Sequence, residues 1–553
     1  MLELSLSFFP VLLLIYLMTK KQAVASHIAL PVIAALTYVI LWLAFSESLL
    51  LLNATVVHGL LKSLTPILII GGAIFLFKTL EATGGLAVIK AELNQVSDKP
   101  VAQLMIIGWA FPFLIEGASG FGTPAAIAAP ILVGLGYPPL KVAILALIMN
   151  SVPVSFGAVG TPTWFGFSAL GLSHSEQLEI GFRSALVHGV VGLLIPLLAL
   201  KQLLSWQSIR RNLVFIQLSL VSTLLPYVII ARFNFEFPAL VAGAIGLLCT
   251  VSLAKHQIGM ANDENLDPSA YSVSDDSTAA NHDSAEQQAK YLIPAATKIR
   301  LYNLTRAAFP IWGTLLFLVI SRIPDLGLKA LLTSTAPLVA LPVGYLGDFA
   351  VSQSLVLNLN NIFGTAESWQ HNTLYIPSIL PFIFISLLAL LWQDKNLKGF
   401  ASVLSFTCTR MKRPTLALFG ALIFVGLMMT GGANSPVSLM GQSLAQISGD
   451  SWTLFAPFLG ALGSFFSGSA TISNLTFGAI QQSIALESSL DQYSILALQS
   501  VGGALGNMVC INNIVAVCSV LGLNNSEGSI LRKTALPMFI YALLAGLLGL
   551  LIL

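Results

Sequence analysis

Long hydrophobic runs, separated by short polar stretches, follow one another along almost the whole chain. Each is close to the length of about 20 residues that a helix needs to cross a bilayer. Unbroken runs lie near residues 4–19, 28–45, 64–80, 178–200, 213–231, 237–254, 301–321, 330–346, 373–392, 415–430 and 534–553. The pattern predicts an all-α polytopic membrane protein with about 12 transmembrane helices.

Two further apolar stretches, residues 101–165 and 452–522, contain too much Gly and Pro for an unbroken helix. The first carries Gly-Thr-Pro twice, at 122–124 and 160–162. Gly allows a turn, Thr can cap the free amides of a new helix, and Pro suits its first position. We therefore expect broken or re-entrant helices in both stretches.

The two halves of the chain share this layout. A shift of 351 residues places ILAL at 144–147 on ILAL at 495–498, Thr123 on Asn474 and Thr161 on Asn512. Asn is a good helix cap, like Thr. A four-residue match alone could be chance, but the agreement of the breaks favours a duplication. Paired, interrupted segments in matching places point to the substrate site of a transporter.

Charge predicts the topology. Basic residues collect between the runs, at Lys20–Lys21, Lys201–Arg211, Lys395–Arg413 and Arg532–Lys533. The positive-inside rule puts these clusters in the cytoplasm and both termini outside, in the periplasm, so the two repeats would be inverted. Residues 255–299 are polar and acidic, and we expect a hydrophilic cytoplasmic linker. The expected domains are residues 1–254, 255–299 and 300–553.

Composition supports this class of protein. Hydrophobic residues make up 56% of the chain and charged residues only 9%, against about 25% in soluble domains. A net charge of +2 gives no reason to expect nucleic-acid binding. The four cysteines fall singly, which predicts neither disulfides nor a zinc site. We expect no cofactor and no metal.

A helix that begins inside the membrane directs its free amides at whatever lies ahead of it, and this favours an anion. The broken stretches contain no Arg and one Lys, Lys141, so a small singly charged anion fits better than a polyanion. Hydroxyl and amide side chains could bind the hydroxyl group of a hydroxy acid. The candidate substrate-binding residues are Ser119, Gly120, Gly122, Thr123, Asn150, Thr161, Ser469, Thr471, Ser473, Asn474, Gln499, Asn507, Asn512 and Asn513.

Glu116 is the acid of the first broken stretch. Acids inside a membrane are costly and usually functional. Burial would favour the neutral form of Glu116, which tolerates a substrate carboxylate better than the charged form does. That is the logic of proton coupling. The alternative is a carboxylate at the aqueous mouth that caps a helix or pairs with Lys or Arg.

Other polar residues in or near the apolar runs have two interpretations each. Arg183 could anchor a helix at the interface or pair with a distant acid, and His188 favours a satisfied core residue over a site. Asp348 could belong to a proton path or to a loop. Residues 345–369 could form a strand-like or re-entrant excursion, or an extracytoplasmic loop. Residues 502–506 (GGALG) could serve helix packing or a site.

Four motifs resemble the L-lactate permease family. They are EGASGFGTP at 116–124, NSVPVSFG at 150–157, SGSATISNLTF at 467–477 and LQSVGGALGNMVCINN at 498–513. The resemblance implies a secondary transporter of the bacterial inner membrane that imports lactate with a proton and often accepts glycolate. Two positions depart from the family's pattern: Ala470 stands where we expect Asn, and Asn512 where we expect His.

The expected function is L-lactate:proton symport, with the lipid bilayer, a small monocarboxylate and a proton as partners. A sodium-coupled carboxylate carrier is the nearest alternative, because backbone carbonyls and Ser or Asn oxygens also suit Na⁺. An enzyme or a channel has no support from the motifs. The sequence leaves open the stereochemical preference, the stoichiometry and whether the protein is a monomer or a homo-oligomer.

Overall fold

The computed structural model describes residues 2–19, 24–120, 123–261, 301–322, 326–376, 378–394, 398–523 and 526–551. The helices of the first part are α1 (Leu2–Thr19), α2 (Ser26–Leu43), α3 (Leu49–Lys62), α4 (Leu64–Ala82), α5 (Gly85–Asn94), α6 (Pro100–Gln103), η1 (Leu104–Ala110), α7 (Phe111–Ser119), α8 (Thr123–Gly134), α9 (Pro139–Met149), η2 (Pro153–Phe156), α10 (Gly157–Trp164), η3 (Ser168–Leu170), α11 (His174–Val191), α12 (Ile195–Leu200), α13 (Trp206–Arg211), α14 (Leu213–Ala231) and α15 (Pro238–Lys255).

The second part adds further helices and four strands. Its helices are α17 (Leu301–Ala307), α18 (Phe309–Arg322), α19 (Leu328–Leu332), η6 (Gly344–Leu346), η7 (Ile362–Gly364), η8 (Ile379–Phe384), α20 (Ile385–Asp394), α21 (Lys398–Met429), η9 (Gly432–Asn434), α22 (Pro436–Ser448), η10 (Gly449–Ser451), α23 (Trp452–Ser467), α24 (Ala470–Glu487), α25 (Gln492–Leu505), η11 (Gly506–Val509), α26 (Ile511–Leu521) and α27 (Glu527–Leu551). Its strands are β1 (Pro337–Pro342), β2 (Asp348–Ser352), β3 (Val356–Asn360) and β4 (Trp369–Asn372).

The chain is a multi-pass membrane protein. Among the described residues, 8 helices are long and apolar enough to cross a membrane, or up to 9 if a bent pair counts as one span. That pair joins α9 to residues 153–170 with a bend of 56°. Four shorter apolar helices accompany them, at residues 2–17, 309–318, 379–392 and 452–465. About 12 transmembrane helices therefore stays a prediction.

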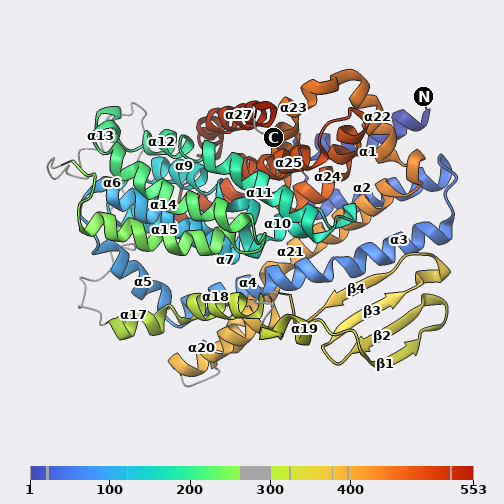
Figure 1. Cartoon of the computed structure of the whole chain (residues 1–553), viewed down its shortest axis with the longest axis horizontal. Coiled ribbons are helices and arrows are strands. Elements are labelled where there is room, and N and C mark those ends of the chain that lie inside the picture. The colour runs from blue at the N-terminus through green and yellow to red at the C-terminus, as the bar shows by residue number, and fades with distance from the viewer. Residues whose placement is uncertain are drawn as a thin grey trace.

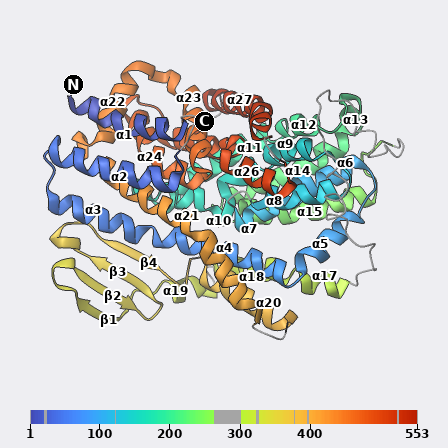
Figure 2. The same ribbon diagram turned by 180° about the vertical axis from the view of Figure 1, so that it is seen from behind.

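Two groups of helices pack closely. In the first, α2, α3 and α21 lie together beside the sheet, as Figures 1 and 2 show from opposite sides. In the second, α23, α24 and α25 pack against one another. A Cβ on Gly502 of α25 would lie 2.1 Å from the carbonyl oxygen of Pro457 in α23, so only glycine lets these two backbones approach. The GGALG stretch thus serves helix packing.

The fold is mostly helical, and the all-α prediction was wrong in one region. Residues 337–372 form a four-stranded antiparallel sheet in the order β1-β2-β3-β4 (Figure 1). Its inner face packs through Leu359, Ile362 and Trp369 on Ala54 of α3. Asp348 begins β2 and accepts a hydrogen bond from Asn361, which places it in this sheet.

The apolar span predicted at residues 330–346 was wrong for the same reason. Its core, PLVALP, is the outer strand β1, and all six of its residues are exposed. A short apolar run has no period that distinguishes a membrane segment from a strand. The prediction for residues 415–430 found only part of a helix. α21 begins at Lys398, and its first half carries the basic residues Arg410, Lys412 and Arg413. These charges lower the hydropathy of the first half, so the apolar pattern showed only the second half.

Candidate functional site

A partly open cavity lies where the two broken regions meet, with about 310 Å³ of space between atoms that includes open solvent. From the first region it is lined by Glu116, Gly120, Asn150, Val154, Gly157, Ala158 and Pro162. From the second region it is lined by Gly468, Ser469, Ala470, Thr471 and Asn507. Both halves of the chain therefore contribute to one site.

The acid of the cavity is Glu116, near the end of α7. Its side chain is 2% exposed, and its Oε2 accepts a hydrogen bond of 3.0 Å from Nδ2 of Asn150. A Cβ on Gly157 would lie 2.5 Å from Oε1, so glycine there makes room for the carboxyl group. The carboxyl group of Glu116 is thus bound by an amide rather than by Lys or Arg, and the residue lies inside the protein.

Asn150 ends α9 and has an unusual environment. Its side chain is 6% exposed, and Oδ1 has no hydrogen-bond partner in the structure. A buried carbonyl oxygen without a partner costs about 1–3 kcal/mol. Asn150 lines the cavity, so this acceptor belongs to a residue on the cavity wall.

The backbone of α10 is strained where it borders the cavity. Ala158, Val159 and Gly160 all have positive φ angles, of 44°, 57° and 69°. Such angles are rare for a β-branched residue, and residues held in this way cluster at functional sites. Only glycine fits at Gly160, because a Cβ would lie 2.0 Å from the carbonyl oxygen of Phe235. The turn therefore occurs directly before Thr161, as the Gly-Thr-Pro motif indicated.

Thr161 itself does not cap a helix through its side chain. The residue is fully buried, and its hydroxyl donates a hydrogen bond to the carbonyl oxygen of Ala158. It stabilises the strained turn instead of facing the cavity, and it is not among the lining residues.

The second half contributes the start of α24. Ser469 is the cap, and its hydroxyl accepts from the amide of Ile472. The amides of Ala470 and Thr471 follow, and by helix geometry they have no partner within the helix. Both residues line the cavity. The prediction that Asn474 begins this helix was wrong, because α24 already starts at Ala470.

Three other predicted residues lie in a hydrogen-bonded network behind the cavity. Gln499 donates to Ser473 at 3.1 Å and to Asn474 at 3.3 Å. Asn474 donates to the carbonyl oxygen of Pro162 at 2.9 Å, which joins the two broken regions. None of the three lines the cavity. Their contacts indicate a role in holding the two regions together.

The remaining predicted residues are distributed around the site. Asn507 lines the cavity, and Asn513 donates to its Oδ1 at 2.9 Å. Asn512 is exposed, as the second residue of α26, and lies near Gly468. Gly122 lies outside the described residues, as do the side chains of Ser119 and Thr123, although Thr123 begins α8.

The sequence pattern did not single out the apolar lining residues Val154, Ala158 and Pro162. Nothing in a sequence distinguishes such residues from ordinary core residues. It also missed the partners of His188. This fully buried ring lies between Ser155, whose Oγ is 2.9 Å from Nε2, and the hydroxyl of Tyr541. His188 is thus a satisfied core residue, as its pattern favoured.

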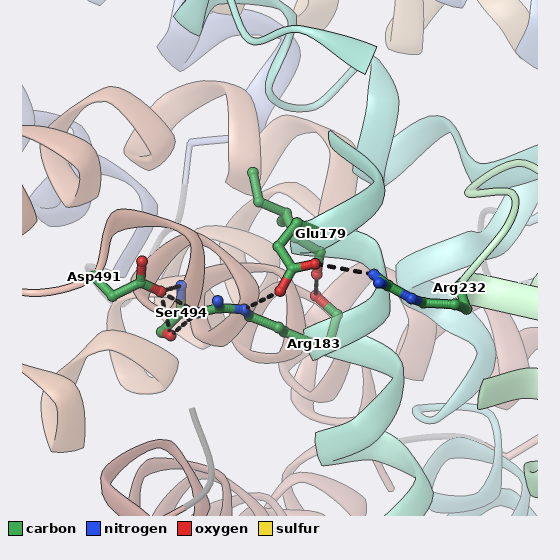
Figure 3. A network of polar contacts seen from close by, with 7 residues as sticks. Glu179, Arg183, Arg232, Asp491 and Ser494 are labelled. Carbon is green, nitrogen blue, oxygen red and sulfur yellow. Dashed lines mark hydrogen bonds and ion pairs between the residues drawn. The ribbon is translucent and has the colours of Figure 1, made fainter. Parts of the chain in front are cut away.

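Arg183 pairs with a distant acid, which was one of its two interpretations. In Figure 3 its guanidinium contacts Asp491, the cap of α25, and also bonds Glu179 at 2.7 Å. Arg232 extends the network by an ion pair of 3.3 Å with Glu179. Residues from both halves meet in this network, outside the cavity. Among the described residues, no group of three His, Cys, Asp or Glu side chains could hold a metal ion.

Comparisons with known proteins identify the family of this chain. The family model for L-lactate permease matches residues 4–553. The protein named "Putative L-lactate permease" from Haemophilus influenzae is 47% identical over 548 residues, which cover 99% of this chain and 98% of that protein. The L-lactate permease of Escherichia coli is 28% identical, with 89% and 85% covered. The glycolate permease of the same species is 27% identical, with 95% and 91% covered. This chain belongs to the L-lactate permease family.

Proposed function

We propose that this protein is a secondary active transporter that imports L-lactate, and related 2-hydroxy monocarboxylates such as glycolate or D-lactate, together with a proton. Relatives named for L-lactate and for glycolate support the substrate class. The observation that carries the proposal is a buried carboxyl group, Glu116, in a cavity that both broken regions line.

In this proposal the start of α24 binds the substrate carboxylate. The amides of Ala470 and Thr471 carry the positive end of the helix dipole, and Ser469 fixes where the helix begins. Polar side chains around the cavity, such as Asn150 and Asn507, hold the hydroxyl group. Direct contact by the other candidate residues stays a prediction.

Glu116 carries the coupling proton in this scheme. A charged Glu116 would repel a carboxylate in the same small cavity, whereas its neutral form would not. Protonation of Glu116 therefore favours substrate binding, and release of the substrate favours loss of the proton. The proton and the substrate would therefore cross the membrane together.

The proposed architecture is a pair of inverted repeats. In chain order, α7, α8, α9, η2 and α10 correspond to α23, α24, α25, η11 and α26, with a short 3₁₀ turn before the last helix of each set. This order supports the duplication. We place the protein in the bacterial inner membrane with both termini periplasmic. Alternating access would move the two broken regions against the framework of α2, α3 and α21.

Uptake by purified protein in proteoliposomes tests this function. A pH gradient, acidic outside, or a Na⁺ gradient is imposed separately, and labelled L-lactate inside the vesicles is measured. We expect accumulation with the pH gradient alone. Accumulation with the Na⁺ gradient alone would replace proton coupling by sodium coupling. No accumulation with either, in vesicles that also fail to exchange lactate, would contradict the transport proposal itself.

A further inference from the structure

We infer that Asn150 recognises the 2-hydroxyl group of the substrate, and that Val154 and Ala470 limit the size of the substituent on the same carbon. This inference rests on the proposed function and deepens it. It assigns Asn150 to the hydroxyl group on the substrate's second carbon, and Val154 and Ala470 to the other substituent of that carbon.

The first step is the state of the Asn150 amide. Nδ2 donates to Glu116, while Oδ1 is buried without a partner in a residue that lines the cavity. A carboxylate only accepts hydrogen bonds, so the nitrogen of the amide must face Glu116 and the oxygen must face elsewhere. A protonated Glu116 keeps one acceptor oxygen, so the same orientation can persist. What the site lacks is a donor for Oδ1.

The second step is which substrate group can supply that donor. A 2-hydroxyl group carries an O–H that can donate to Oδ1. A carboxylate and a 2-oxo group carry acceptors only, and a plain hydrocarbon chain carries neither. Occupancy by a 2-hydroxy acid therefore satisfies the buried oxygen. Occupancy by a 2-oxo acid places two acceptors against each other, which is the kind of mismatch that gives strong discrimination.

The third step is the apolar part of the cavity. Val154 of η2 and Ala470 of α24 pack together with Ala504 and are 5% and 3% exposed. Both line the cavity, from opposite halves of the chain. Ala470 is also the first residue of the helix whose amides face the carboxylate. A hydrogen or a methyl group on the second carbon can lie against this apolar patch, whereas a larger substituent would clash with it.

The experiment is counterflow in proteoliposomes, which needs no proton gradient. Unlabelled L-lactate is loaded inside, and labelled L-lactate uptake is competed with glycolate, pyruvate and propionate. For the wild-type protein we expect glycolate to compete at least about tenfold better than pyruvate or propionate. Equal competition by propionate or pyruvate would overturn the inference, and this measurement needs no variant that folds.

Two variants then test the role of Asn150 and the role of the apolar patch independently. Asn150→Leu removes the acceptor at similar volume, and we expect the preference for L-lactate over propionate to fall at least about tenfold. Ala470→Val narrows the apolar patch, and we expect L-lactate exchange to fall several-fold relative to glycolate. The matched control is Asn212→Leu, because Oδ1 of Asn212 accepts from the amide of Ala261 and Asn212 does not line the cavity. Its ratios should equal those of the wild type.

The outcomes are distinguishable. If the wild-type protein exchanges no 2-hydroxy acid, the proposed function fails, and this inference fails with it. If it exchanges L-lactate but the ratios do not change in Asn150→Leu, only the role of Asn150 is wrong. If Ala470→Val lowers glycolate and L-lactate equally, the patch does not set the size limit.

Discussion

At the residue scale, the cavity depends on one buried carboxyl group. Glu116 is 2% exposed and accepts a hydrogen bond from an amide, and among the described residues no cation pairs with it. Glu116→Gln keeps the shape and the hydrogen bonding but cannot release a proton. We expect lactate exchange to continue. We expect pH-driven accumulation to fall by at least about tenfold, because proton binding would no longer be coupled to lactate binding. Uptake and counterflow in the same vesicles measure the two quantities.

Glu81→Gln is the control for Glu116→Gln. Glu81 pairs with Lys78 at a helix end, and its side chain is 51% exposed. The same chemical change there should leave both accumulation and exchange unaltered. Full pH-driven accumulation by Glu116→Gln would remove Glu116 from the coupling scheme.

The backbone beside the cavity allows a second test at this scale. Gly120 has φ 62° and ψ −158°, a region that is essentially restricted to glycine. A Cβ there would also lie 3.1 Å from Cβ of Ala158. We expect Gly120→Ala to lower the free energy of unfolding by about 1–3 kcal/mol and to reduce uptake. Thermal unfolding in detergent and vesicle uptake measure these effects.

Gly84→Ala is the comparison for Gly120→Ala. Gly84 also has a positive φ, 73°, but nothing lies within 4 Å of the position of a Cβ. We expect only the conformational cost, about 1 kcal/mol, and unchanged uptake. Equal losses in the two variants would mean that the space around Gly120 is not limiting.

The sequence identified polar site residues better than apolar ones. Glu116 and Asn150 stand out because polar groups are rare in apolar stretches, and both line the cavity. Val154 and Ala158 do not stand out, since an apolar wall and an apolar core have the same composition. Asn474 was misplaced because an Asn can cap a helix or bind a neighbouring carbonyl group, and only the tertiary structure decides between these roles.

At the scale of elements, the breaks were predictable and the sheet was not. Gly and Pro within an apolar run have a local meaning, so α8, α10 and α26 begin at or near the predicted positions. The sheet depends on contacts with Ala54 of α3, which lies more than 300 residues earlier in the chain than its partners. Such a contact has no local signal, and the apolar β1 therefore resembled a membrane span.

The attachment of the sheet to α4 gives a prediction on pH. His371 of β4 contacts Thr65 at 2.8 Å, and burial lowers the pKa of His371 to about 4. The folded state therefore binds fewer protons than the unfolded state. The free energy of unfolding is therefore highest above pH 6.5, the ordinary pKa of His, and declines as the pH falls from 6.5 toward 4. We expect hydrogen exchange in β3 and β4 to accelerate between pH 7 and pH 5, after correction for the intrinsic rate.

His371→Gln should remove most of this pH dependence. A neighbouring group does not produce the same effect, because a hydrogen bond from His58 lowers the pKa of Glu367 below its ordinary value of 4.5. The stability from Glu367 is thus lost only at lower pH. An unchanged exchange profile in His371→Gln would assign the pH dependence to another group.

At the scale of the whole molecule, ion pairs and packing suggest which parts move together. Arg183 and Asp491 join α11 to α25 (Figure 3), and Ser184 of α11 donates to the carbonyl oxygen of Ala497 in α25. We propose that these helices move as one body with the broken regions. The opposite boundary is the cluster of Phe165, Leu422 of α21 and Leu475 of α24, where these two helices pack against each other.

Cross-links test this division. In a variant without the native cysteines, a short thiol cross-linker joins Leu422→Cys to Leu475→Cys. We expect this cross-link to lower uptake at least about tenfold, because it fixes the moving part to the framework. The control pair Ser184→Cys and Ala497→Cys should leave uptake near its value before cross-linking. Uptake that survives the first cross-link would exclude motion at this boundary.

The outer strand of the sheet has a practical consequence. All of β1 is exposed, and β2 occupies only one of its two edges in the described structure. An antibody fragment selected to add a strand at the free edge would attach to a part of the protein that does not line the cavity. Such a fragment would enlarge a particle that otherwise lies mostly within detergent. Single-particle images could then be aligned while the substrate pathway stays open.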